Sequence, residues 1–171
     1  MWYVIQVVGG REESVLQLIR KYADANTYTE VFVPRYRAAK HTGGAWEYSF
    51  PVLTPGYVIV DTHDVTVFEA QLHRIPQFTR LLGDNSGFKP LDRQEMAWLQ
   101  QWTQRGERVM QGSTGRIKKG KLRILSGPLV GREADVIRVN RRKHQAVVRL
   151  TMMGREKEIT LEFELLGKSD E

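Results

Sequence analysis

The side chains with the clearest chemical potential are a run of cations between positions 116 and 143. This stretch contains ten Lys or Arg residues and two acidic residues, and six of the ten are arginine. Two interpretations are open: a surface that binds a polyanion such as nucleic acid, and a lysine-rich face that is merely solvated. The planar guanidinium group suits phosphate recognition, so the arginine content favours the polyanion surface.

Seven of these cations are the candidate RNA ligands, because a small barrel could bring their two stretches of sequence to one rim. Each phosphate that they neutralise releases a counterion, so binding should weaken as salt rises. Arginine also permits bidentate contact with guanine edges, and we expect a structured RNA hairpin to be preferred. The seven are Lys118, Lys119, Lys121, Arg123, Arg141, Arg142 and Lys143.

Residues suited to catalysis or metal binding form no recognisable pattern. The chain has no cysteine, and its four histidines (His41, His63, His73 and His144) are dispersed without metal-ligand spacing. His63 and Asp64 are adjacent, and adjacent strand residues face opposite ways, so a polar pair in a turn is the favoured interpretation. Nucleotide-binding loops and hydrolase motifs are missing. We expect a protein that is not an enzyme and needs no metal or cofactor.

The first 105 residues show the order β-α-β-β-β-α-β-α, which predicts an α+β sandwich. Two helices carry candidate capping boxes, Thr66 with Glu69 and Asp92 with Glu95. His41–Gly44 is expected to be a hairpin tip or a flexible loop. The predicted elements are Trp2–Val8, helix Arg11–Ala25, Thr29–Arg37, Trp46–Leu53, Tyr57–Val60, helix Thr66–Arg74, Thr79–Leu82 and a helix ending near Arg105.

The C-terminal part alternates apolar and polar residues over short runs, which predicts half-buried antiparallel strands. Leu122, Ile124 and the series from Ala146 to Met152 are examples. Gly127 and Gly131 can adopt positive φ, and Pro128 suits the second position of a tight turn. Five such strands predict a small closed β-barrel.

The N-terminal and C-terminal parts of the chain differ in net charge. Residues 1–114 hold 12 basic and 12 acidic residues, whereas 115–171 hold 14 and 8. We therefore expect two domains, 1–106 and 120–171, joined by a Gly-containing linker at 107–119, with Gly112–Gly115 read as part of that linker. No apolar run approaches the ~20 residues of a spanning helix. We expect a cytoplasmic monomer with no membrane association.

The Gly127-Pro128 turn, with its strands and basic residues, resembles the KOW module of the NusG family of transcription factors. Several N-terminal segments, in order, resemble the NGN domain of that family. They are WYVIQV, Val33-Pro34, Leu53–Val60, Ile75-Pro76 with Leu82-Gly83, and Pro90-Leu91. The resemblance implies an NGN α/β sandwich with an antiparallel sheet and three helices, followed by a five-stranded KOW barrel.

The resemblance also implies that the N-terminal domain binds the clamp helices of RNA polymerase. It places Leu53, Pro55, Gly56 and Tyr57 at or near that contact. Thr54 departs from the family, which usually has an aromatic residue there. A lost ring could weaken the contact, and Tyr36, Tyr48 or Phe50 could compensate.

The implied function is that of a transcription elongation and processive antitermination factor whose basic KOW domain holds nascent RNA. The basic composition of the C-terminal part favours a specialised paralogue of the LoaP or RfaH type. One alternative is a housekeeping NusG whose KOW domain binds Rho or a ribosomal protein. Another is a ribosome-associated RNA-binding protein, which the neutral N-terminal half disfavours.

Overall fold

The computed structural model describes residues 1–167 and divides into two compact units. The first consists of Met1–Pro34 and Val52–Ala97, and the second of Arg35–Pro51 and the chain from Trp98 onward. Each unit is therefore built from two separate stretches of sequence. The change in net charge along the sequence suggested a boundary at residue 106. The two units differ from that division, because residues 35–51 group with the C-terminal part.

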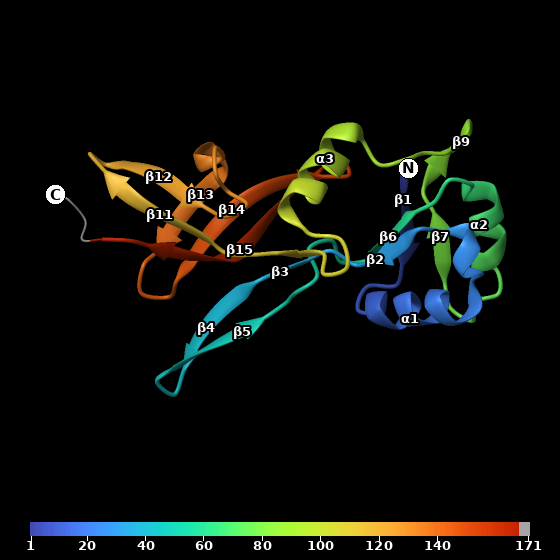
Figure 1. Ribbon diagram of the computed structural model, residues 1–171, viewed down its shortest axis with the longest axis horizontal. Coiled ribbons are helices and arrows are strands. Elements are labelled where there is room, and N and C mark those ends of the chain that lie inside the picture. Colours follow the sequence, from blue (N-terminus) through green and yellow to red (C-terminus); the bar gives the residue numbers. More distant parts are fainter. Residues whose placement is uncertain (168–171) are drawn as a thin grey trace. The chain divides into compact units, whose positions relative to one another are not determined.

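The first unit contains a four-stranded antiparallel sheet in the order β2-β6-β1-β7. Figure 1 shows this sheet with helices α1 and α2 beside it. Helix α3 (Arg93–Trp102) begins in the first unit and ends in the second. The other elements of the first unit are β1 (Trp2–Val7), α1 (Glu12–Tyr22), η1 (Ala25–Thr27), β2 (Glu30–Phe32), β6 (Tyr57–Asp61), α2 (Val65–Leu72), β7 (Thr79–Leu81), β8 (Gly83–Asp84) and β9 (Gly87–Phe88).

The core of the first unit forms where α1 and α2 meet one face of the sheet. Alternate residues of β1 and β6 enter it, as the period of two in a strand requires. Helix α1 contributes Val15, Leu16 and Ile19. Tyr22, three residues after Ile19, is 43% exposed. The helix ends there, and the next residue, Ala23, is buried in its place.

Short aspartate side chains set the starts of α2 and α3. Asp64, not Thr66, caps α2, because the carboxylate of Asp64 accepts a hydrogen bond from the Val67 N–H at 3.1 Å. The capping box expected at Thr66 is therefore wrong by two residues. At α3, Asp92 accepts from the Gln94 N–H at 2.8 Å. Among residues 1–167, no helix is both long and apolar enough to cross a membrane.

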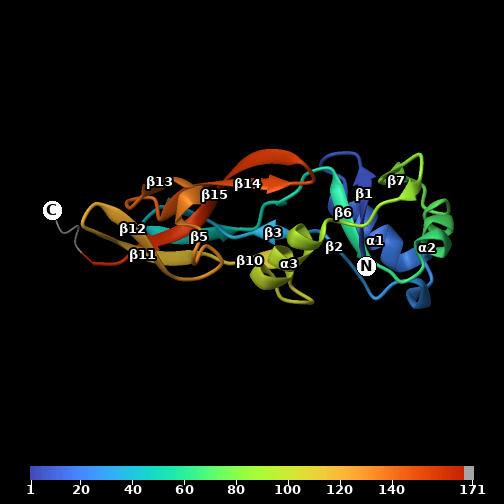
Figure 2. The same ribbon diagram turned by 90° about the horizontal axis from the view of Figure 1, so that it is seen from above.

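The second unit contains a curled five-stranded sheet in the order β12-β11-β15-β14-β13, which confirms the expected small five-stranded sheet (Figure 2). We call this sheet the barrel. Neighbouring strands are antiparallel except β11 and β15, which are parallel. The elements are β11 (Ser113–Lys118), β12 (Lys121–Ser126), η2 (Glu133–Asp135), β13 (Val136–Asn140), β14 (Gln145–Met152) and β15 (Arg155–Leu165).

Strands also occupy the stretch 107–119, where a linker was expected. They are β10 (Val109–Met110) and β11, and β10 pairs in parallel with β3 (Arg35–Tyr36). Gly115 lies within β11, where an added Cβ would meet the Phe163 ring at 2.8 Å and the Arg123 carbonyl oxygen at 2.7 Å. Gly115 therefore allows the neighbouring strands to approach closely. In the sequence, a glycine with this role is indistinguishable from a glycine of a flexible linker.

Residues 35–51 form an arm that belongs to the second unit. It holds β3 and the hairpin of β4 (Ala38–Thr42) and β5 (Ala45–Ser49), whose tip at Gly43-Gly44 matches the expected one. The strand expected at Thr29–Arg37 is broken at Val33-Pro34, because proline has no N–H to donate. Gly43-Gly44, Lys119-Gly120 and Met153-Gly154 are all at positive φ, as the two-residue turns of tight hairpins require.

Candidate nucleic-acid interface

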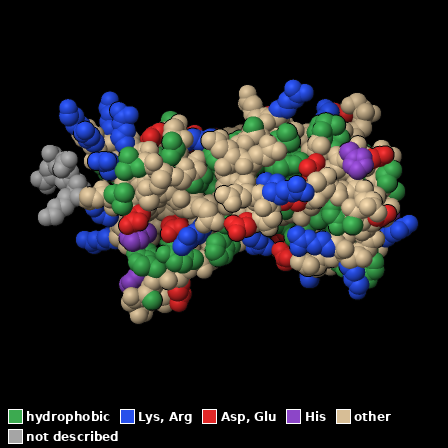
Figure 3. Space-filling model, viewed as in Figure 1, with side chains coloured by type: hydrophobic (Ala, Val, Ile, Leu, Met, Phe, Trp, Pro, Cys, Tyr) green, Lys and Arg blue, Asp and Glu red, His purple; other side chains and the backbone are tan. Residues whose placement is uncertain are grey.

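The seven predicted RNA ligands all lie at one end of the barrel. We call them the basic rim: Lys118, Lys119, Lys121, Arg123, Arg141, Arg142 and Lys143. The β11–β12 turn and the β13–β14 turn that carry them both lie where β15 ends, because Gly115 pairs with Leu165 and Gln145 with Glu162. All seven side chains are exposed. Lys and Arg side chains project from this end in Figure 3.

Like charges face each other across β11 and β12. Arg116 lies opposite Arg123, and Lys118 lies opposite Lys121. Such pairs destabilise a hairpin unless an anion neutralises them. Within residues 1–167, no carboxylate forms an ion pair with Lys118, Lys119 or Lys121. The arrangement therefore suits phosphate groups.

Arg116 is a further rim cation that the candidate set omitted. It is exposed and shares its face of β11 with Lys118, two residues away. The period of two in a strand could have identified it. Two other arginines of the barrel are paired instead: Arg132 contacts Asp135 at 2.7 Å, and Arg149 contacts Glu156 at 2.9 Å.

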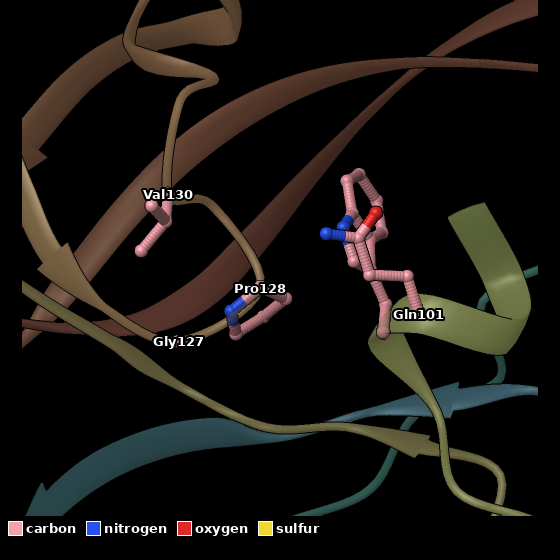
Figure 4. A pocket seen from close by; sticks show the side chains of 5 residues that line it. Gln101, Gly127, Pro128 and Val130 are labelled. Carbon is pink, nitrogen blue, oxygen red and sulfur yellow. The ribbon is translucent and has the colours of Figure 1, made fainter.

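The turn after β12 closes the barrel. Gly127 has φ +94°, and the Leu129 N–H donates to the Ser113 hydroxyl at 3.2 Å. Figure 4 shows a hollow beside this turn, lined by Gly127, Pro128 and Val130 together with Gln101 and Trp102 of α3. The expected role of Gly127 and Pro128 in a tight turn agrees with this geometry.

The turn before β6 carries the residues expected to contact the polymerase. Leu53 and Thr54 are 1% and 6% exposed, so the accessible part of the segment is Pro55, Gly56 and Tyr57. The Tyr57 N–H donates a hydrogen bond to the Thr54 carbonyl oxygen at 3.2 Å, and Gly56 has φ +87°. Proline second and a positive-φ glycine third are the features of a type II turn.

Glu12 holds this turn in place. It is 4% exposed, and its Oε1 atom accepts from the backbone N–H groups of Gly56 at 2.7 Å and Gly10 at 3.1 Å. Glu12 also lies in the first turn of α1, where the helix dipole favours a negative charge. No spacing in the sequence signals its contact with Gly56.

We expect Glu12→Ala to lower the free energy of unfolding by about 1–3 kcal/mol, because two backbone donors would lose their acceptor. Urea denaturation of the full chain measures this. Glu13→Ala, an exposed neighbour on the same helical turn, is the matched control and should change stability by less than about 0.5 kcal/mol. Equal effects of the two substitutions would contradict the role of Glu12.

The suggested aromatic replacements for Thr54 all lie in the second unit: Tyr36 and Phe50 at the base of the arm, and Tyr48 on β5. The Tyr36 N–H donates to the Pro51 carbonyl at 3.1 Å, and Phe50 is 46% exposed. Burial raises the pKa of the Tyr36 phenol, so it stays protonated. Leu53–Tyr57 lies in the first unit.

Two of the dispersed histidines meet in the fold. His41 and His144 both contact the ring of Trp46. His73 pairs with Glu69 at 2.9 Å. In the part of the chain that the structure describes, no group of three His, Asp or Glu residues could hold a metal ion.

Comparison with known proteins agrees with this architecture. A family model described as "Transcription termination factor nusG" matches residues 1–100. Proteins named "Transcription termination/antitermination protein NusG" from Haemophilus influenzae and Yersinia pestis are each 25% identical to the chain. The first alignment covers 95% of this chain and 90% of the relative, and the second covers 98% and 95%.

A solved structure entitled "Domain interaction in Thermotoga maritima NusG" has the same fold. It superposes with a TM-score of 0.58 at 18% identity, covering 94% of this chain and 92% of that one. The family model spans more than half of the chain, and the curled sheet with its Gly-Pro turn follows it in sequence. The chain belongs to the NusG family.

Proposed function

We propose that this protein is a transcription elongation and antitermination factor that binds RNA polymerase through its first unit and nascent RNA through the basic rim. The observation that carries the RNA part is the convergence of seven exposed cations at one end of the barrel. The family and the names of its relatives support a role in transcription termination or antitermination.

The proposed mechanism involves no chemistry by the protein itself. The first unit binds the polymerase clamp better in its closed, processive state than in its paused state, and differential affinity is what shifts such an equilibrium. RNA held at the rim would raise the effective concentration of the factor near the polymerase. The protein would act in the cytoplasm as a monomer.

The RNA assignment favours a specialised paralogue of the LoaP or RfaH type over a housekeeping NusG. The rim's facing cation pairs support it, because a surface for Rho or a ribosomal protein would not require concentrated like charge. Affinity of the full chain for an RNA hairpin separates these two functions. Tight, salt-dependent binding supports the paralogue, and its absence supports the protein-binding alternative.

For the polymerase contact, we expect Tyr57→Ala to weaken binding to a clamp-helix fragment about tenfold, because aromatic residues often anchor interfaces. Tyr57 is half-buried beside the exposed Pro55. Isothermal titration calorimetry with the full chain measures the affinity. Leu53 is unsuitable for this test, because it is 1% exposed and a charge there would disrupt folding.

Tyr22→Ala is the matched control, because Tyr22 is 43% exposed on α1 and belongs to no proposed contact. It should bind the fragment as the parent does. If Tyr57→Ala also leaves the affinity unchanged, the polymerase contact does not include this turn.

A further inference from the structure

The arm carries an aromatic stack beside the basic rim. The rings of Trp46 on β5 and His144 in the β13–β14 turn lie nearly parallel, with centroids 3.9 Å apart and an angle of 11° between planes. His41, opposite Trp46 on β4, packs against the same ring edge-on at 5.0 Å. His41 is exposed, and Trp46 and His144 are half-buried.

Several contacts fix the arm to the barrel and so fix the position of the stack. The Glu162 N–H donates to the Arg37 carbonyl at 3.0 Å, and the Arg37 Nε atom lies 3.0 Å from the Glu162 carboxylate. Gln145 donates its side-chain amide to the Ala39 carbonyl at 3.0 Å. The stack is therefore held by backbone and ionic contacts that do not depend on the rings themselves.

The backbone at His144 supports a role for its ring. His144 has φ +48°, a left-handed conformation that costs energy for any residue with a Cβ. Strained backbone conformations concentrate at functional sites. This conformation follows directly after Arg141, Arg142 and Lys143, so three rim cations and the stacked ring share one turn.

We propose that Trp46, His144 and His41 form a stacking site for an unpaired base of RNA bound at the basic rim. Flat rings are the usual platform for bases splayed out of single-stranded loops, and neighbouring cations hold the flanking phosphates. The cations around the rings favour RNA over an apolar protein segment as the occupant. The inference rests on the proposed RNA binding and adds which part of the RNA the protein contacts.

The test uses the full chain and two RNA probes. One is a single strand of about 12 nucleotides, within the range of known single-strand sites, that carries the fluorescent base 2-aminopurine. The other is a blunt duplex of the same length. Trp46→Ala should weaken single-strand binding about 5- to 100-fold, the range of one base stack, and leave duplex binding unchanged. The salt slope should stay the same, because stacking releases no counterions.

Further variants and a direct readout keep the test decisive. Binding to the parent should quench 2-aminopurine, and Trp46→Ala should abolish that quenching. Trp46→Phe should retain most of the affinity because it keeps a flat ring. Phe78→Ala, which removes a 55% exposed ring from the first unit, is the matched control and should bind as the parent does.

Three results would overturn the stacking site. One is unchanged single-strand affinity in Trp46→Ala, with the parent's salt dependence intact, which would leave rim binding standing. Another is an equal loss on single strand and duplex, which would make the ring a support for the arm. The last is 2-aminopurine quenching that is as strong in Trp46→Ala as in the parent, which would mean that the base does not stack on Trp46. A parent that binds neither RNA probe would instead refute the proposed function itself.

Discussion

Replacing Gly127 with alanine is expected to unfold the barrel. Gly127 has φ +94°, and an added Cβ would lie 2.5 Å from the Gly112 carbonyl oxygen and 2.6 Å from the Ser113 Cα. Both of these are backbone atoms, so no side chain can move aside to relieve the clash. The left-handed backbone adds a further penalty of about 1–2 kcal/mol. Together, the clash and the backbone penalty should lower the free energy of unfolding by more than about 4 kcal/mol, a loss that few single substitutions cause.

Urea denaturation followed by circular dichroism measures this loss. Gly131→Ala is the matched control, because Gly131 belongs to the same turn and has φ +77°, but open space surrounds its missing side chain. It should cost only the backbone penalty of about 1–2 kcal/mol. If both variants lose the same stability, the close approach at Gly112 and Ser113 is not what makes glycine necessary.

The second large effect is expected at the basic rim. The parent should bind an RNA hairpin with a slope of log K against log salt of about −3 to −5, as four to six phosphate contacts give. Arg141→Glu combined with Arg142→Glu should weaken binding on the order of a hundredfold and flatten the slope by about 1.5, because two contacts are lost. Fluorescence anisotropy at several salt concentrations measures both quantities.

A matched control separates position from net charge. Arg80→Glu with Arg155→Glu changes the charge equally. Arg80 is exposed in the first unit, and Arg155 pairs with Met152 at the opposite end of the β14–β15 hairpin. This control should retain most of the affinity and the whole slope. If the two double variants lose affinity equally, the protein binds RNA through its overall charge and not through the rim.

Much of the barrel was predictable because its strands are half-buried. In β14, Ala146, Val148 and Leu150 are buried, and the residues between them are more exposed. This alternation is visible in the sequence because the period of two is local. The parallel pairing of β11 with β15 was not predictable, because it joins segments distant in sequence.

The candidate sites were predictable only in part, because local sequence patterns do not show which distant residues pack together. The cations of the rim are visible as composition, and the barrel places them where short antiparallel turns must lie. The contacts of Glu12 with Gly56 and of Trp46 with His144 join residues distant in sequence, and residue spacing does not encode such packing. The grouping of residues 35–51 with the barrel is likewise a tertiary property.

The parallel pairing of β11 with β15 also orders the folding of the second unit. The β14–β15 hairpin is local, and hairpins of this kind form within about 1–10 μs. We expect Ser113 to pair with Phe163 later than this hairpin forms, because the pairing joins segments distant in sequence and such non-local pairing is slow. The two turns of the basic rim are brought to one end by β15. We therefore expect a nascent chain to assemble the basic rim late, once β15 has been synthesised, and earlier intermediates to carry its cations without bringing them together.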